Sequence, residues 1–169
     1  MKENTKKYLI YFYCFSIIGF IWEFTIKCFT EKNFIKPGVL FGPWLPIYGV
    51  GIIIIIILSR KLKNKFILSI TSFISTGLLE YSTSVALENL FHKKYWDFSD
   101  LPLNINGRIS FFTTFGFTIA AFLAIKYIIS LLDKLVERVD NLKLKIILTI
   151  VSVVFAIDYI SSIIYNLIR

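Results

Sequence analysis

Residues 39–59 read VLFGPWLPIYGVGIIIIIILS, and this stretch decides which class of protein the chain belongs to. It contains no charged residue, and residues 52–57 are all isoleucine. A helix that crosses a bilayer needs roughly 20 mostly apolar residues, whereas the strands of a membrane barrel are short and alternate apolar with polar side chains. We therefore predict a transmembrane helix here, broken near its start by Pro43 and Pro46.

The composition of the whole chain agrees with a membrane protein. Of its 169 residues, 56% are hydrophobic and 18% are charged, whereas about 25% of residues are charged in soluble domains. A soluble domain of this size needs charges to cover its surface, so the composition argues against a soluble enzyme and a disordered chain. Four further runs have the length of a membrane span, and they comprise residues 8–29, 66–91, 109–132 and 146–168. We predict an all-α fold, a polytopic helix bundle with about five transmembrane helices, in a single domain of residues 1–169.

The net charge of +8 lies at the flanks of the apolar runs and not in a compact basic domain. Nucleic acid is therefore not an expected partner, whereas membrane lipids are. The cytoplasmic connections of membrane proteins carry the excess of Lys and Arg, and here these residues gather before residue 8 and in the connections 60–65 and 133–145. We expect a plasma-membrane protein with its N-terminus in the cytoplasm and its C-terminus outside.

The sequence predicts no metal site, cofactor or catalytic residue. Cys14 and Cys28 lie in the first apolar run, where the helix separates them by about 21 Å, far beyond the reach of a disulfide. The chain has no HExxH pattern and no recognisable pair of nucleophile and base. A membrane-embedded enzyme that uses Glu80 or Asp97 as a general base therefore ranks last among the functions considered.

The connection between the first two spans has an unusual composition. Residues 36–51 read KPGVLFGPWLPIYGVG, with three prolines and four glycines. This segment cannot form a regular helix, yet it is too apolar to lie in water, and broken backbone at membrane depth is tolerated where protein buries it or a water-filled cavity borders it. We expect a re-entrant segment that leads into the second span. The alternative is an interfacial turn with Trp44 and Tyr48 in the aromatic belt.

The second connection on this side, residues 92–108, reads HKKYWDFSDLPLNINGR and alternates aromatic with polar side chains. Asn104, Asn106 and Gly107 favour turns, and Arg108 precedes the fourth span. With its rings toward the membrane, the loop presents carboxylates, amides and a guanidinium that suit an outward-facing site for a polar substrate. The alternative is a loop that its aromatic rings merely anchor in the interface.

Three acids, Glu23, Glu80 and Asp158, lie inside predicted spans, where an ionisable side chain costs roughly 2.5–3.5 kcal/mol at the bilayer centre. They fall at nearly one depth if each helix rises about 1.5 Å per residue. One of them belongs to a polar stripe at every fourth position, which comprises Ser72, Thr76, Glu80, Ser84 and Glu88. Two interpretations stay open: the acids hydrogen-bond helices to one another, or they line a path for a substrate or a cation.

Two basic residues are placed to pair with these acids. Lys27 follows Glu23 by one helical turn, and Arg108 can reach Glu88 or Glu80 from the start of the fourth span. A buried acid without such a cation would have a raised pKa. The sequence therefore predicts ion pairs at both places.

Five motifs carry a family resemblance, and they read GFIWE (19–23), GPWLPIYGVG (42–51), LEY (79–81), YWDFS (95–99) and NINGR (104–108). In order and spacing they resemble the ABC-transporter permease family called CmpB-like, or type IV. The resemblance covers about residues 8–130 and leaves helix 146–168 as an addition. Lys36-Pro37-Gly38 and Phe41-Gly42-Pro43 stand where the family has Arg-Gly and Tyr-Gly-Pro, which are mild departures.

The resemblance implies a bacterial integral membrane protein that serves as a permease component. The chain has no Walker A pattern, so a separate ATPase subunit would have to dock on its cytoplasmic connections. The family implies no particular substrate. The loop motif residues that the resemblance singles out are Gly42, Pro43, Pro46, Tyr48, Gly49 and Trp96.

Together, these observations predict a small transporter component of the bacterial plasma membrane. Homo-oligomerisation is expected because about five helices barely enclose a cavity. The residues expected to line an outward-facing polar site are Glu23, Glu80, Glu88, Asp97, Asn104, Asn106 and Arg108. The alternative is a non-transporting scaffold or partner subunit whose buried acids serve helix packing.

Overall fold

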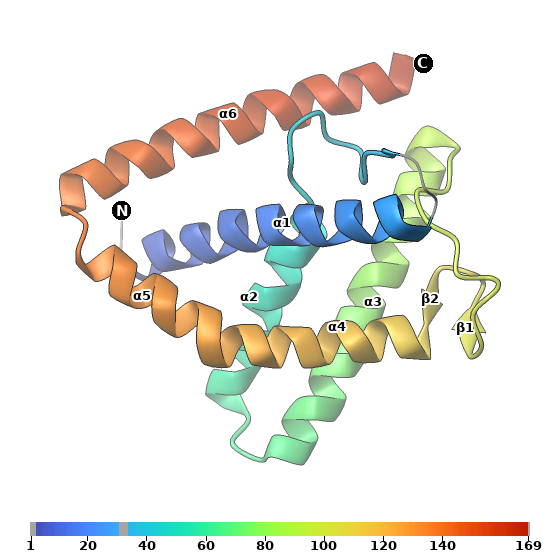
Figure 1. The fold of residues 1–169 in the computed structure, drawn as a ribbon, viewed down its shortest axis with the longest axis horizontal. Coiled ribbons are helices and arrows are strands. Elements are labelled where there is room, and N and C mark those ends of the chain that lie inside the picture. Colours follow the sequence, from blue (N-terminus) through green and yellow to red (C-terminus); the bar gives the residue numbers. More distant parts are fainter. Residues whose placement is uncertain (1–2, 31–33, 169) are drawn as a thin grey trace. The chain divides into compact units, whose positions relative to one another are not determined.

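The computed structural model describes residues 3–30 and 34–168, and its elements are labelled in Figure 1. Helix accounts for 77% of the chain, in five helices, so the all-α prediction is confirmed. The elements are α1 (Glu3–Thr30), α2 (Pro46–Lys61), α3 (Lys65–Phe91), β1 (Asn104–Ile105), β2 (Ile109–Ser110), α4 (Phe111–Ala124), the π-helical turn η1 (Ile125–Ile129), α5 (Ser130–Glu137) and α6 (Asn141–Ile168). Of these, α4, η1 and α5 follow one another without a break as a single helix, Phe111–Glu137.

Helix α3 agrees with the predicted span 66–91 to within one residue, whereas the four other spans begin elsewhere, the first of them at Glu3 and not at residue 8. The second helix begins only at Pro46, because proline suits the first turn of a helix and not its interior. The fourth begins at Phe111, because the two residues before it pair with β1 in a short antiparallel ladder. The fifth begins earlier than predicted, at Asn141, where the side chain of Asp140 accepts hydrogen bonds from the first backbone N–H groups of α6.

Within the described ranges, three helical stretches are long and apolar enough to cross a membrane: Asn4–Phe29, Phe111–Glu137 and Asn141–Ile168. Helix α2 has 16 residues and therefore measures about 24 Å, less than the ~30 Å of a hydrocarbon core. Helix α3 has 27 residues, but its polar stripe lowers its hydropathy. Insertion of all five helices thus remains a prediction.

The chain divides into two compact units, which we describe separately. The first unit comprises Met1–Gly49 and Ile129–Arg169. In it α1 packs against α6, and the core there contains Ile10, Tyr13 and Leu148. The ring of Trp44, from the segment before α2, lies edge-on to that of Phe155 with the centroids 5.7 Å apart.

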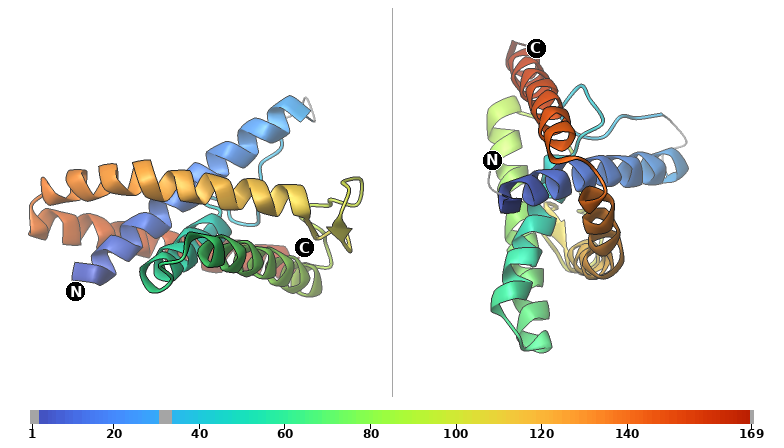
Figure 2. Two further views of the ribbon diagram at one scale, coloured as in Figure 1. Left: turned by 90° about the horizontal axis from the view of Figure 1, so that it is seen from below. Right: turned by 90° about the vertical axis from the view of Figure 1, so that its left-hand side faces the viewer.

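The second unit is Val50–Ile128, and Figure 2 shows its short connection between α2 and α3. Packing in this unit is most extensive between α3 and α4. The Oγ1 atoms of Thr76 and Thr118 lie 3.3 Å apart there, and Thr114 borders Gly77. Small side chains of this kind allow membrane helices to approach closely and to bond through hydroxyls. The polar stripe of α3 therefore faces a neighbouring helix.

Candidate functional site

The irregular segment 34–45 of the first unit is held to α6 by a carboxylate. The backbone N–H of Phe41 donates to Oδ1 of Asp158 at 3.0 Å, and that of Gly42 donates to Oδ2 at 2.9 Å. Hydrogen bonds to an ionised acceptor are stronger than those between neutral groups. Asp158 of α6 thus satisfies backbone groups of a segment that has no regular structure of its own.

Two further side chains of α6 extend this attachment. Oγ of Ser162 accepts from the N–H of Phe41 at 2.8 Å and donates to Asp158 at 3.0 Å, while Nδ2 of Asn166 donates to the carbonyl oxygen of Val39 at 3.3 Å. Asp158, Ser162 and Asn166 recur every fourth residue and so share one face of the helix. We call these three residues the α6 anchor. Asp158 and its anchor partners are absent from the predicted site, although their spacing was a signal that could have found them.

A basic residue accompanies the α6 anchor. Lys36 lies in the same irregular segment, and its Nζ donates to the carbonyl oxygen of Leu40. Partial burial lowers the pKa of Lys36, and the negative charge of Asp158 partly opposes that shift. Burial is thus the larger of the two effects on Lys36, and the charge of Asp158 is the smaller.

Glu23 of α1 binds the first turn of α2. Oη of Tyr48 donates to Oε1 of Glu23 at 2.5 Å, so among the described residues its partner is Tyr48 and not the predicted Lys27. Gly19 makes this contact feasible, since a Cβ at that position would lie 2.3 Å from Cγ of the Tyr48 ring. The N–H of Leu45 also donates to the carbonyl oxygen of Ser16 at 2.9 Å, which fixes the end of the irregular segment on α1.

In the second unit, the C-terminal part of α3 meets Arg108. Nη1 of Arg108 lies 2.6 Å from Oε2 of Glu88 and donates to Oγ of Ser84 at 3.1 Å, which confirms the predicted ion pair. The guanidinium carbon lies 5.9 Å from the ring centroid of Tyr81. The side chains of Arg108 and Glu88 are 19% and 32% exposed, while Oε2 of Glu88 itself is buried. We call these four residues the Arg108 cluster.

The loop before α4 positions this cluster. Nε1 of Trp96 donates to the carbonyl oxygen of Arg108 at 2.9 Å, and Nδ2 of Asn106 donates to Oη of Tyr81 at 3.1 Å. Asn106 and Gly107 have φ angles of 54° and 67°, the left-handed conformation that Asn and Gly tolerate best. Through its hydrogen bond to Tyr81, the side-chain amide of Asn106 contacts the Arg108 cluster directly.

Asn104 and Asp97 fold the loop itself. The side chain of Asn104 donates to the carbonyl oxygens of Ser99 and Leu101 and accepts from the N–H of Gly107. Oδ1 of Asp97 accepts from Oγ of Ser99 at 2.5 Å and from its N–H at 2.9 Å. These hydrogen bonds, the hydroxyl first, lower the pKa of Asp97. Both predicted site residues thus contact their own loop.

Glu80, the remaining predicted site residue, lies on α3 at the interface with α4. Oγ1 of Thr114 donates to its Oε2 at 3.2 Å. Glu80 therefore takes part in the packing of α3 against α4. Glu23 belongs to the first unit, and the other six residues of the predicted site belong to the second.

The loop motif residues are divided between the two units of the chain. Gly42 binds Asp158 and Tyr48 binds Glu23. Pro43 lies in the irregular segment, and Pro46 and Gly49 lie in the first turn of α2. Trp96 belongs to the second unit. In residues 3–30 and 34–168 no three side chains of His, Cys, Asp or Glu come together in a way that could hold a metal ion.

Comparison with known proteins gives one match. The model of the family described as "Putative ABC-transporter type IV" matches residues 10–163, which include most of α6 and extend well beyond residue 130, where the resemblance of the motifs ends. No curated protein and no solved structure matches the chain.

Proposed function

Because this chain belongs to the family described as "Putative ABC-transporter type IV", we propose that it is the permease-like membrane component of a transporter. Its three long apolar helices agree with a membrane protein. We further propose that α2 and α3 also insert, since Thr76, Glu80 and Ser84 of α3 bond within the protein, and that the chain works as a homo-oligomer in the bacterial plasma membrane.

The Arg108 cluster is the proposed place where a polar solute first meets the protein. The supporting observation is that the side chains of Arg108 and Glu88 stay partly exposed while Ser84, Tyr81 and Trp96 contact Arg108. A guanidinium binds carboxylate or phosphate groups through paired N–H donors. The Arg108 cluster thus holds a cation in place beside a loop of polar side chains.

A second proposed role, structural support, concerns the acids of the first unit. Glu23 and Asp158 are each engaged with the segment between α1 and α2. This arrangement favours a scaffold role for these two carboxylates over a role in a solute path. A non-transporting partner subunit, with every acid in such a role, is the alternative function.

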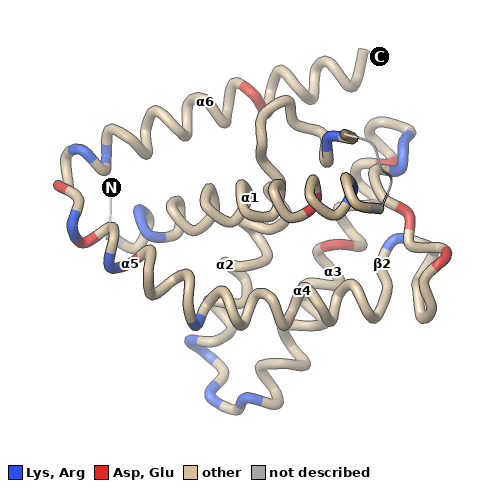
Figure 3. The backbone as a smooth tube through the Cα atoms, in the orientation of Figure 1, with Lys and Arg blue, Asp and Glu red and all other residues tan. Residues whose placement is uncertain are grey.

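The proposed topology places the loop 92–108 outside. In each unit taken separately, basic residues gather at particular places (Figure 3): at the start of α1 and around the connection between α5 and α6 in the first, and around the connection between α2 and α3 in the second. A Ser99→Cys variant, made after Cys14 and Cys28 are replaced by serine, should react with a membrane-impermeant maleimide added to intact cells. Labelling only in inverted vesicles would reverse the proposed orientation.

The transporter function itself is tested by isolating the full chain in native-lipid nanodiscs. We expect an ATPase subunit to co-purify and to hydrolyse ATP. The Arg108→Gln variant should assemble equally well but hydrolyse ATP about tenfold more slowly. Loss of the proposed contact between the guanidinium and the solute would then raise the activation free energy of the transport cycle by about 1.4 kcal/mol. The Glu80→Gln variant should keep its activity, since the amide oxygen still accepts from Thr114.

Two results would contradict the proposal. If no ATPase accompanies the protein under conditions that retain its lipids, the scaffold alternative gains. If Arg108→Gln lowers thermal stability and assembly in the same proportion as ATP hydrolysis, Arg108 serves structure and not the solute.

A further inference from the structure

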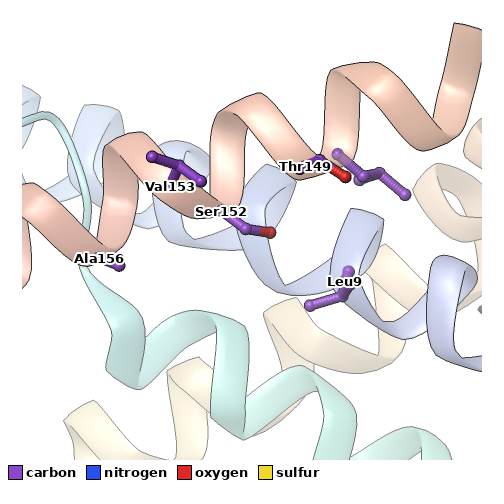
Figure 4. A pocket seen from close by; sticks show the side chains of 6 residues that line it. Leu9, Thr149, Ser152, Val153 and Ala156 are labelled. Atoms are coloured by element: carbon purple, nitrogen blue, oxygen red, sulfur yellow. The ribbon is translucent and has the colours of Figure 1, made fainter.

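A pocket lies between α1 and α6 of the first unit, near the ends of these helices that carry most basic residues. Its volume is about 270 Å³. The residues that line it are Leu9, Leu148, Thr149, Ser152, Val153 and Ala156, and Figure 4 shows Leu9 of α1 opposite the side chains of α6. Val153 is 53% exposed, so the pocket opens on the surface of the unit.

The lining of this pocket is mainly aliphatic, and it offers no hydroxyl that lacks a partner within the protein. It contains two hydroxyls, and both already have partners in the protein: Thr149 donates to the carbonyl oxygen of Lys145 at 2.9 Å, and Ser152 accepts from Oη of Tyr13 at 2.9 Å. A hollow lined by aliphatic groups holds hydrocarbon and not water. On the surface of two helices that can cross a membrane, the hydrocarbon at hand is an acyl chain.

Basic side chains lie one helical turn from the pocket on both helices. Lys6 precedes Leu9 by three residues, and Lys145 precedes Leu148 by three and Thr149 by four, so each lysine shares a helix face with the lining. The Nζ of Lys6 donates to Oδ1 of Asn141 at the start of α6, which brings the two helix ends together.

Further basic residues surround this place, and they are Lys7, Lys134, Arg138 and Lys143. Two of the nearby acids have partners within the protein. Asp133 accepts from Tyr11 and pairs with Lys7, while Asp140 caps α6. The helix ends therefore keep an excess of positive charge beside a hydrocarbon-lined pocket.

We propose that this pocket binds one acyl chain of an anionic phospholipid, whose phosphate group lies against Lys6 and Lys145. The inference rests on the insertion of α1 and α6, which is part of the proposed function. The pocket extends over only about 12 Å of α6, from Leu148 to Ala156, whereas a partner helix would need a longer seam. An apolar pocket one turn from two cations matches the amphiphilic chemistry of a lipid.

Native mass spectrometry of the delipidated full chain tests this proposal, with dioleoyl phosphatidylglycerol and dioleoyl phosphatidylcholine as probes at equal concentration. We expect the anionic lipid to stay bound and the zwitterionic lipid to leave. The Lys6→Gln/Lys145→Gln variant should lose about tenfold in affinity for the anionic lipid, because each lysine near an anionic headgroup contributes measurably. Ala156→Phe, which fills the pocket, should lower the affinity for both lipids.

Matched variants supply the controls. Lys63→Gln/Lys65→Gln removes the same charge from the connection between α2 and α3, and Ala120→Phe adds the same ring to an exposed position of α4; both should bind lipid like the unmodified protein. Equal retention of the two lipids, or an equal loss in the two lysine pairs, would overturn the site. A chain recovered from the soluble fraction would instead refute membrane insertion and thus the proposed function.

Discussion

Gly49→Ala is expected to lower the unfolding temperature strongly, whereas the same substitution at Gly116 should raise it slightly. A Cβ at position 49 would lie 2.5 Å from the carbonyl oxygen of Phe12 and 2.6 Å from Oγ of Ser16. A backbone oxygen of α1 cannot move aside alone, so α2 must withdraw from it, and overpacking of this kind costs about 1–3 kcal/mol. At Gly116 an added Cβ would meet nothing within 4 Å.

Thermal unfolding in detergent, followed by tryptophan fluorescence, measures both changes. Gly116→Ala is the control, since alanine in a helix is favoured over glycine by roughly 0.5–1 kcal/mol. Withdrawal of α2 should also weaken the Tyr48–Glu23 hydrogen bond, so Gly49→Ala should make a further Tyr48→Phe substitution almost without effect. Equal unfolding temperatures for the two glycine variants would show that α1 and α2 do not approach closely at this point.

The positions of the helices follow from the sequence where apolar length decides them. Helix α3 agrees with its predicted span because residues 66–91 have no internal breaker. Its polar stripe also indicates correctly that one face meets another element, since an exposed hydroxyl and carboxylate stripe would be costly in lipid. Arg108 and Glu88 pair as expected because the loop that follows α3 folds back and brings Arg108, just before β2, to the last turns of α3.

Contacts between distant segments could not be predicted from periodicity. The hydrogen bond between Phe41 and Asp158 joins residues 117 positions apart, and nothing local in either segment specifies the other. Lys27 is one turn from Glu23, but Gly19 allows the ring of Tyr48 to lie against α1, and its hydroxyl reaches the carboxylate. Tertiary packing thus selects a partner that local helix spacing does not indicate.

The start of α2 shows how local and distant effects combine. Pro46 explains why the helix cannot begin earlier within 39–45. The backbone of that segment still needs hydrogen-bond partners, because unsatisfied N–H groups are costly wherever they are removed from water. The carboxylate of Asp158 supplies acceptors for two of them, so the polar residue in α6 compensates for the irregular backbone.

Asp158→Ala is therefore expected to release the segment 34–45 from α6. Hydrogen bonds to a charged acceptor contribute about 1.5–3 kcal/mol each, and the substitution removes both of those from Phe41 and Gly42. Hydrogen–deuterium exchange of peptides that cover residues 38–45 should become at least tenfold faster, because opening of this segment costs less free energy. The unfolding temperature should fall as well.

Two matched variants distinguish the effect of losing the carboxylate from the effect of any substitution in this part of α6. Asp158→Asn keeps one acceptor oxygen and should cause a smaller increase in exchange, whereas Ser161→Ala alters an exposed position of the same helix and should cause none. Because only the backbone of the segment is released, peptides from α3 and α4 should exchange as in the unmodified protein. Unchanged exchange of residues 38–45 in Asp158→Ala would mean that Ser162 and Asn166 suffice to hold the segment, and that the acid in α6 serves a different purpose.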